Sequence, residues 1–389
     1  MNRSVVVCLA FAADPNLGSE AGAGAALVRS AAEFAATQGF GLVVYTRTKH
    51  SADVQQMLSR GVGEIRVIGV DGWKSKALGS SMGFRLESLV WQARVWVRVR
   101  RLTRENSVAA IHHMTMASDA MPGAVHFLSR TKVRTIWGPV GSSSVALNTG
   151  QSWQSRSLRV LKSLWFTALA RRVSVVVSQT DWVAKQLIGG RVSSFVEQNC
   201  SVDDEVVTSV RATRMLTPNH GDRVIVVGEL IERKRPRLAC MAAEYLPITT
   251  EMVFVGDGPL RDTLEESFAP LVASGRIKFT GKIPRQEVLH LLAKSSLLLH
   301  LASREGAGWV VAESLACGTQ VVAVDGSGAD CLVRKVLYGG EVVSDSVAND
   351  PRALANVING LVSNSQNPAY AGQWSEARFV RLMGDWYRP

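Results

Sequence analysis

Long apolar runs, paired cysteines and metal-ligand clusters are scarce in this chain of 389 residues. No stretch approaches the ~20 uninterrupted apolar residues that a membrane-spanning helix needs. The five cysteines are scattered, odd in number and without the spacing of a zinc site, which is typical of reduced cytosolic cysteines; they are Cys8, Cys200, Cys240, Cys317 and Cys331. No Asp-x-Asp pair occurs. We therefore expect no spanning helix, no disulfide framework and no metal site.

Acidic residues are nearly missing between Gly72 and Thr180. This segment holds sixteen Lys or Arg and three acids, a surplus of 13 positive charges, against +11 for the whole chain. Such a segment implies an anionic partner. Tryptophan and leucine interleave with its arginines at Trp91, Trp96, Trp153, Leu161, Leu164, Trp165 and Phe166. Basic helices of this composition favour an anionic membrane surface. The alternative is a core of tryptophans with a solvated basic face; nucleic acid is not expected, because no zinc finger or helix-turn-helix signal accompanies the charge.

Strand-like and helix-like patterns alternate through both halves, which predicts an α/β protein with two Rossmann-like domains. In the first half we expect strands at residues 5–10, 41–46, 65–70, 108–113, 135–137 and 173–178, a glycine loop at 18–24 and a helix at 21–37. In the second half we expect strands at 223–228, 251–256, 277–280, 296–301 and 319–324, with helices at 236–244, 260–268, 285–293 and 309–317. Active-site loops are expected at the carboxyl ends of the strands.

The amino-terminal run at residues 4–13 has the outline of a short signal peptide, and also that of the first strand of a Rossmann domain. We prefer the strand, because the run is only moderately apolar and leads directly into the glycine loop. A cytoplasmic protein is the corresponding expectation.

One segment, residues 303–318, combines an anion site with two carboxylates. The apolar run at 297–301 predicts a buried strand, Gly306 and Gly308 loosen the connection, and the helix follows. The N–H groups at a helix start suit a diphosphate. Glu305 lies in the loop and Glu313 about one turn inside the helix, where carboxylates beside an anion are expected to bind sugar or ribose hydroxyls. The alternative is that both glutamates are merely solvated.

These motifs, in this order, resemble the retaining glycosyltransferases of family four, which have the B-type fold of two facing Rossmann domains with a cleft between them. The resemblance rests on residues 228–234, 255–260, 279–284 and 305–313. Residues 18–24, 112–115 and 137–141 resemble a bacterial branch that builds surface polysaccharides. The resemblance implies an acceptor-side domain at 1–202, to which a terminal helix at 373–389 returns, and a donor-binding domain at 203–372.

The resemblance also implies a role for each matching position. Lys234 would contact the donor diphosphate, Glu313 the ribose hydroxyls, and Glu305 the transferred sugar. Phosphate would be bound by the backbone of Gly306, Ala307, Gly308 and Trp309. The base would be contacted at its edge by the backbone of Lys282 and Ile283. The first domain's loop, with Gly18, Glu20, Gly22 and Gly24, would approach the donor. One of His112 and His113 would reach the sugar, because neighbours on a strand point to opposite faces, and His113 is preferred.

The implied reaction is retaining front-face transfer from a nucleotide-diphosphate sugar to a lipid-linked or glycan acceptor at the inner face of the membrane, without a metal or other cofactor. Two departures weaken the match. Glu229 stands where many relatives have Arg, and Ser142–Ser144 replaces a glycine-rich stretch. They leave open a non-catalytic partner subunit, and the same fold also serves nucleotide-sugar epimerases and phosphorylases.

Overall fold

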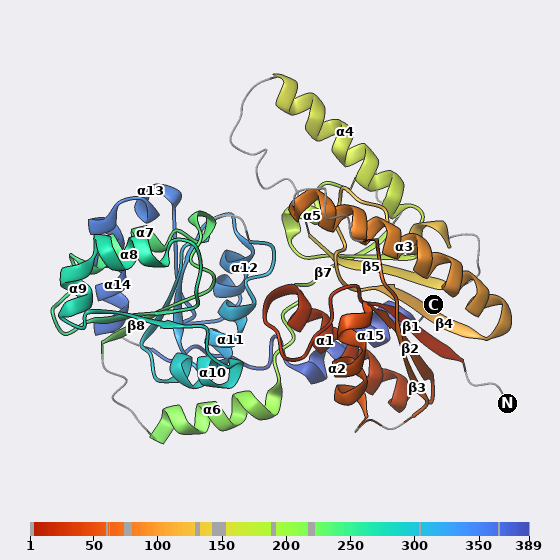
Figure 1. The fold of residues 1–389 in the computed structure, drawn as a ribbon, viewed down its shortest axis with the longest axis horizontal. Helices are drawn as coiled ribbons and strands as arrows, with labels where there is room; N and C mark the ends of the chain where they lie inside the picture. Colours follow the sequence, from red (N-terminus) through yellow and green to blue (C-terminus); the bar gives the residue numbers. More distant parts are fainter. Residues whose placement is uncertain are drawn as a thin grey trace. The chain divides into compact units, whose positions relative to one another are not determined.

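The computed structural model describes residues 4–59, 61, 63–73, 80–128, 133–141, 153–187, 192–216, 222–302, 305–364 and 366–388. The chain forms two compact units (Figure 1). The first comprises Met1–Ser201 together with Glu376–Pro389, and the second comprises Val202–Ser375. Each contains a parallel sheet with helices on both faces, so the predicted pair of Rossmann-like domains is confirmed.

The first unit is built on a seven-stranded parallel sheet in the order β3-β2-β1-β4-β5-β6-β7. Its strands are β1 (Val5–Leu9), β2 (Gly41–Thr46), β3 (Ile65–Gly69), β4 (Val108–His113), β5 (Arg134–Val140), β6 (Val175–Ser178) and β7 (Ser193–Val196). The central strand β1 pairs with β2 and β4, with Val7 opposite both Val43 and Ile111. Runs of valine without polar alternation form these strands because both faces of the sheet are covered.

The helices of the first unit are α1 (Ser19–Thr37), α2 (Thr48–Leu58), α3 (Ser80–Glu105), the 3₁₀ helix η1 (Ala124–Phe127), α4 (Trp153–Ala170), α5 (Asp181–Ala184) and α15 (Glu376–Tyr387). Helices α1 and α15 pack on one face of the sheet, where Leu27 and Phe379 join one core with Val6. Helices α3 and α4 pack on the other face, where Trp91 and Phe166 join a second core.

The second unit is built on a six-stranded parallel sheet in the order β10-β9-β8-β11-β12-β13. Its strands are β8 (Arg223–Val227), β9 (Glu251–Val255), β10 (Ile277–Gly281), β11 (Leu297–His300), β12 (Gln320–Val324) and β13 (Gly340–Val343). Its helices are α6 (Asp204–Leu216), the 3₁₀ helix η3 (Glu232–Lys234), α7 (Pro236–Ala243), α8 (Arg261–Ser267), α9 (Ala269–Ala273), α10 (Arg285–Ala293), α11 (Trp309–Cys317), α12 (Gly328–Arg334), α13 (Asp345–Ala348) and α14 (Pro351–Ser363). Helices α7 and α14 cover one face, and α10, α11 and α12 lie side by side on the other (Figure 1).

Several expected elements match the structure at both ends, among them β2, β4 and α11. The expected first strand is also confirmed, as β1 is a buried central strand. The expected helix at 21–37 is confirmed as α1, which ends at Thr37 as expected but begins two residues earlier, at Ser19, so the expected loop at 18–24 is wrong from that residue onward. A Cβ added to Gly24 would lie 2.1 Å from the Ala12 carbonyl oxygen, so this glycine allows α1 to pack closely inside the unit. Strands β7 and β13 were not expected; each has only four residues.

The tryptophans of the basic segment differ in their environment. Trp91 is fully buried, and its ring meets Phe11 edge-on at 5.3 Å, so it belongs to the core and not to an exposed membrane-binding face. Phe166 is buried as well. Trp165 is 48% exposed on α4, and its indole N–H donates to the Ala120 carbonyl at 3.2 Å. Within the described ranges no helix is both long and apolar enough to cross a bilayer.

The terminal helix α15 belongs to the first unit although the chain reaches it from the second. It lies beside α1 (Figure 1), where the Arg29 guanidinium donates to the Glu376 carboxylate at 2.6 Å. At its other end the Tyr387 ring packs edge-on against Phe34 at 5.2 Å. The first core is therefore completed by the last residues of the chain.

Candidate active site

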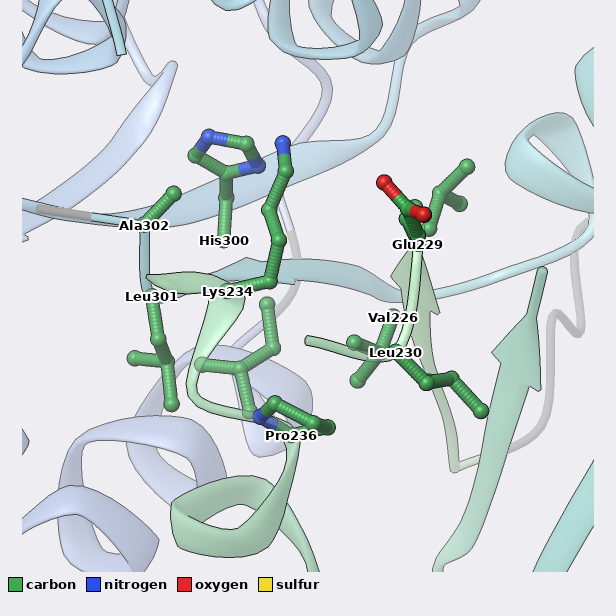
Figure 2. Close-up of a pocket in the computed structure, with 11 residues that line it drawn as sticks. Val226, Glu229, Leu230, Lys234, Pro236, His300, Leu301 and Ala302 are labelled. Carbon is green, nitrogen blue, oxygen red and sulfur yellow. The ribbon is translucent and has the colours of Figure 1, made fainter. Parts of the chain in front are cut away.

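The centre of the second sheet is a topological switch point. Strands β8 and β11 are neighbours, but the chain continues from β8 toward β9 on one side and from β11 toward β12 on the other. Loops that leave the carboxyl ends of two such strands diverge, and ligands of open α/β sheets bind in the crevice between them. A pocket lies here (Figure 2), lined by Val226, Val227, Gly228, Glu229, Leu230, Lys234, Pro236, Leu299, His300, Leu301 and Ala302.

Lys234 is held over this pocket by the loop after β8. Gly228 ends that strand with φ of +143°, and a Cβ placed on it would lie 3.5 Å from Lys234 Cε. The positive φ is what requires glycine here, since a Cβ at this distance would only make ordinary contact with the lysine side chain. The Lys234 ammonium donates to the Glu305 carboxylate, and Arg233 approaches the same oxygen, Oε1, at 3.7 Å. Two cations thus converge on one carboxylate.

Glu305 also contacts His300, the last residue of β11. The His300 ring is buried, and its Nε2 lies 2.5 Å from Glu305 Oε2 without the alignment of a hydrogen bond. Burial raises the pKa of Glu305, but the contacts with His300 and Lys234 outweigh it and hold the pKa well below its usual range. Figure 2 shows the His300 ring beside the Lys234 amine. The carboxylate is therefore ionised and held against two residues that line the pocket, Lys234 and His300.

The loop that carries Glu305 is pinned to the start of α12. The Gly328 amide donates to the Glu305 carbonyl at 2.7 Å, and a Cβ on Gly328 would lie 2.1 Å from the Gly306 carbonyl oxygen. Gly308 caps α11 in the left-handed conformation, with φ of +63°. The position of Glu305 and the start of α11 thus depend on glycines in two separate segments.

Glu313 lies on the second turn of α11 and is buried. Arg285, the first residue of α10, donates from Nε to Glu313 Oε1 at 2.8 Å, and its NH2 lies 2.8 Å from the same oxygen in an ion pair. The Arg285 guanidinium also lies over the Trp309 ring at 4.5 Å. Burial raises the pKa of Glu313, and Arg285 partly opposes this shift.

The other two motifs of the second unit pack backbone against backbone with the Lys234 loop. A Cβ on Gly256 would lie 2.0 Å from the Gly228 carbonyl oxygen, and one on Gly258 would lie 2.6 Å from that of Leu230. The Gly256 amide in turn donates to the Gly281 carbonyl at 2.9 Å. Lys282 and Ile283 follow Gly281 directly, between β10 and α10. The predicted donor-binding residues of this unit therefore come from four segments at one edge of the sheet.

Glu229, which stands where the resemblance leads us to expect an arginine, is exposed and lines this pocket. Of the three arginines that follow it, Arg235 pairs with Asp345 at 2.6 Å and Arg237 is exposed on α7. Arg233 is the one that approaches the Glu305 carboxylate. Ser142–Ser144 lies outside the described residues.

The two expected histidines of the first unit point to opposite faces of β4. His112 Nε2 donates to the Gly138 carbonyl at 2.8 Å, and its Nδ1 accepts from the Tyr387 hydroxyl at 2.8 Å. Burial lowers the pKa of His112 to about 4, although the bond to Gly138 partly offsets this. His112 is thus enclosed beneath α15, and a contact with substrate from this position is not expected.

His113 lies beneath α3 and η1. Gln92 accepts the Ala124 amide through Oε1 at 2.9 Å, which turns its amide nitrogen toward His113 Nε2 at 3.1 Å. Burial, with the neighbouring His126, lowers the pKa of His113 to about 3. The ring is therefore neutral, and its role toward a sugar stays a prediction.

Glu20, at the start of α1, braces the loop after β4. Its Oε1 accepts the Met116 amide at 2.7 Å, and Met116 has φ of +56°. Burial raises the pKa of Glu20, and this hydrogen bond opposes the shift. Gly18 is the N-cap of the same helix, with open space around it.

Sequence reasoning missed Arg285, His300 and Gly328. His300 had one signal, a polar residue that ends an otherwise apolar strand. Arg285 and Gly328 lie outside the motifs, and only the packing of α10, α11 and α12 brings them to the site. In the part of the chain that the structure describes, no three His, Cys, Asp or Glu residues gather as a metal site would require.

Two parallel α/β sheets in separate units define the fold of the B-type glycosyltransferases. Solved structures share it over almost the whole chain: HepE of Anabaena in complex with UDP (TM-score 0.62, 16% identity, 98% of both chains) and the lipopolysaccharide glycosyltransferase WaaG (TM-score 0.58, 17% identity, 98% of this chain and 95% of that one).

Residues 215–378, which make up most of the second unit, match the family described as Glycosyl transferases group 1, so the predicted resemblance is confirmed. The chain is 29% identical over 190 residues, 48% of its length, to the lipopolysaccharide core biosynthesis glycosyltransferase LpsE of Rhizobium meliloti. It is 32% identical over 111 residues, 28% of its length, to the putative teichuronic acid biosynthesis glycosyltransferase TuaC of Bacillus subtilis. These matches span 55% of LpsE and 26% of TuaC.

Proposed function

We propose that this protein is a retaining glycosyltransferase, which moves a sugar from a nucleotide-diphosphate sugar to a glycan acceptor in the synthesis of a cell-surface polysaccharide. The observation that carries the proposal is the pairing of Lys234 with Glu305 at the switch point of the second sheet, with Glu313 on the helix that follows, in a unit that matches the group 1 family. LpsE and TuaC are named for polysaccharide synthesis, which supports the pathway class. HepE was solved with UDP and with UDP-glucose, which makes uridine nucleotides the first donors to test.

In the proposed reaction the bond between the anomeric carbon and the diphosphate oxygen breaks on the same face on which the acceptor hydroxyl attacks. The acceptor oxygen bonds to the anomeric carbon, and its proton passes to the leaving diphosphate. Lys234 and Arg233 would neutralise the leaving group, and the start of α11 would add its dipole. Glu305 would orient the transferred sugar, and Glu313 would hold the ribose. No metal or further cofactor is needed in this scheme.

A donor screen tests the first half of this proposal. UDP-sugars and GDP-sugars are added to the purified protein, and calorimetry measures binding. We expect one nucleotide class to bind, and Lys234→Ala and Glu313→Ala each to weaken that binding by at least about tenfold. Lys294→Ala is the matched control, because Lys294 is exposed near the opposite, amino end of β11. No binding of any donor would instead favour a non-catalytic partner subunit.

Transfer is tested separately with radiolabelled donor and membrane extracts. We expect label to enter a glycan or lipid-linked product with the wild-type protein and the Lys294→Ala control, and to fall strongly with Lys234→Ala. Unchanged transfer by both Lys234→Ala and Glu313→Ala would contradict the roles assigned to these two residues. Release of free, isomerised sugar without acceptor would point to an epimerase.

We further propose that the first unit lies on the anionic inner face of the membrane, where it would meet a lipid-linked acceptor. Helix α4 supports this with an exposed apolar stripe at spacings of one helical turn, formed by Val160, Leu161, Leu164 and Trp165. On the neighbouring helix α3, the arginine surplus includes Arg94, Arg98, Arg100 and Arg101. Apolar residues flanked by arginine are typical of a segment in the bilayer interface.

Cosedimentation with phospholipid vesicles tests this location. We expect binding to vesicles with anionic phosphatidylglycerol, loss of binding in high salt, and little binding to neutral phosphatidylcholine. The double change Leu161→Glu and Trp165→Glu should abolish binding. Leu337→Glu is the control, since Leu337 is equally exposed but lies in the second unit. Equal binding of both variants would refute the role of α4.

A further inference from the structure

We infer that Arg285 is the positioning residue that makes the nucleotide site selective for ribose, because it fixes the Glu313 carboxylate in place. The inference rests on the proposed function, in which Glu313 receives the ribose hydroxyls. It concerns a residue outside the motifs that identify the family, on a helix that carries no other candidate side chain of the site.

The contact between Arg285 and Glu313 joins two helices. Arg285 is the first residue of α10, and Glu313 lies on the second turn of α11. Nε of the guanidinium donates to Oε1 at 2.8 Å, and NH2 lies at the same distance from Oε1 as an ion pair. Two nitrogens of one rigid planar group against the carboxylate restrict it far more than the single flexible ammonium of a lysine would.

Trp309 fixes the arginine in turn. The guanidinium carbon lies 4.5 Å from the centre of the Trp309 ring, in the geometry of a cation–π contact. Trp309 is the first residue of α11, one turn before Glu313. The three side chains therefore form one unit, in which the ring orients the guanidinium and the guanidinium orients the carboxylate.

The same contact governs the charge of Glu313. The carboxyl group is buried, and burial raises its pKa while Arg285 lowers it. Arg285 is the charged group that shifts the pKa of Glu313, whereas Arg211 and Arg214 from α6 act on Cys317, one turn further along α11. Without Arg285 the pKa of Glu313 rises further, and a protonated carboxyl is a poorer acceptor for two hydroxyls than a carboxylate.

The predicted signature is a change in the preference for ribose over deoxyribose. A site that hydrogen-bonds a hydroxyl rejects the analogue without it, because its own buried polar group then stays unpaired. We expect the wild-type protein to bind UDP or GDP at least about tenfold more tightly than the matching 2′-deoxynucleotide. A merely structural role of Arg285 would change both affinities alike.

Calorimetry with UDP, GDP, 2′-deoxy-UDP and 2′-deoxy-GDP measures this preference in wild type, Arg285→Lys, Arg285→Met and Arg352→Met. Arg352 is the matched control, since its guanidinium also lies over an aromatic ring, Tyr245 at 5.2 Å, on a different helix. In Arg285→Lys and Arg285→Met we expect the ribose preference to fall below about threefold, with little change in deoxynucleotide affinity. The control should keep the wild-type preference.

Two further measurements complete the test. Thermal unfolding verifies that each variant is folded. In Arg285→Met, ribonucleotide affinity should weaken more steeply than in wild type as the pH falls from about 8 to about 6. Equal loss of ribo- and deoxynucleotide binding, or a wild-type preference in Arg285→Lys, would overturn the inference alone. A wild-type protein that binds none of the four nucleotides would overturn the proposed function as well.

Discussion

Removing the Lys234 ammonium should separate the stability of the second unit from its ability to bind nucleotide. In Lys234→Met the aliphatic stem still passes beside Gly228, but Glu305 loses its closest cation. Arg233 remains at 3.7 Å and His300 at 2.5 Å, so the carboxylate keeps part of its compensation. The change therefore tests one ion pair and not the whole loop.

The size of the effect follows from burial. Breaking a fully buried ion pair costs about 3–5 kcal/mol, because it leaves an uncompensated charge. The side chains of Lys234 and Glu305 are 16% and 22% exposed, so solvent and the remaining partners reduce the cost. We expect Lys234→Met to lower the free energy of unfolding of this unit by about 1–3 kcal/mol. At about 2–4 °C per kcal/mol, this corresponds to a loss of roughly 2–12 °C in Tm.

A double-mutant cycle supplies the assay. Lys234→Met, Glu305→Gln and the double variant are melted in a scanning calorimeter, and hydrogen exchange of peptides from the second unit assigns the transition. The double variant removes the buried charge as well, so it should be more stable than the sum of the single losses by about 1–2 kcal/mol. Nucleotide binding should nevertheless stay weak in both variants that lack Lys234.

Two outcomes would refute this reasoning. Strictly additive losses in the double variant would mean that the pair has no energetic role. Wild-type affinity for nucleotide in Lys234→Met would mean that the lysine does not contact the diphosphate, whatever its effect on stability.

Three further changes probe other parts of the structure. Gly328→Ala places a Cβ 2.1 Å from the Gly306 carbonyl, so the Glu305 loop must move; we expect weaker nucleotide binding by calorimetry, with a folded first unit by circular dichroism. Tyr387→Phe removes the hydroxyl that donates to His112, which should cost about 1 kcal/mol in urea unfolding, and no change would contradict this bond. The first unit should also lose stability as the pH falls below about 6.5. In the unfolded state its histidines become protonated near that pH, whereas in the folded state burial keeps the rings of His112, His113 and His126 neutral until about pH 4 or lower. Thermal melts at pH 7 and pH 5 measure this effect.

The sequence predicted best those elements whose residues are buried on both faces. Strands β2 and β4 and helix α11 lie where continuous apolar runs or helical spacing end abruptly at polar residues or glycine. The start of α1 was placed two residues late, because the glycines at 18, 22 and 24 suggest a loop when their packing partners are unknown. Gly24 is required by the Ala12 backbone, twelve residues earlier, which no local pattern reveals.

The residues of the candidate site also divide into those that the sequence predicted and those that only the structure reveals. Lys234, Glu305 and Glu313 were predicted from motifs, and the structure brings them to one edge of the second sheet. Their partners were not predictable, since Arg285 is 28 positions before Glu313 on another helix. The sequence also could not tell core tryptophans from exposed ones. Trp91 and Trp165 both lie in basic helical segments, but Trp91 is buried and Trp165 is half exposed.

The terminal helix gives the order in which the two units reach completion during synthesis. Phe379, Met383, Trp386 and Tyr387 are part of the core beneath α1, and they leave the ribosome after the whole second unit. The second unit is continuous from Val202 to Ser375 and has all its strands before α15 is made. The first unit therefore cannot complete its core until the second unit has been synthesised, and until then the apolar face that α15 covers is left open.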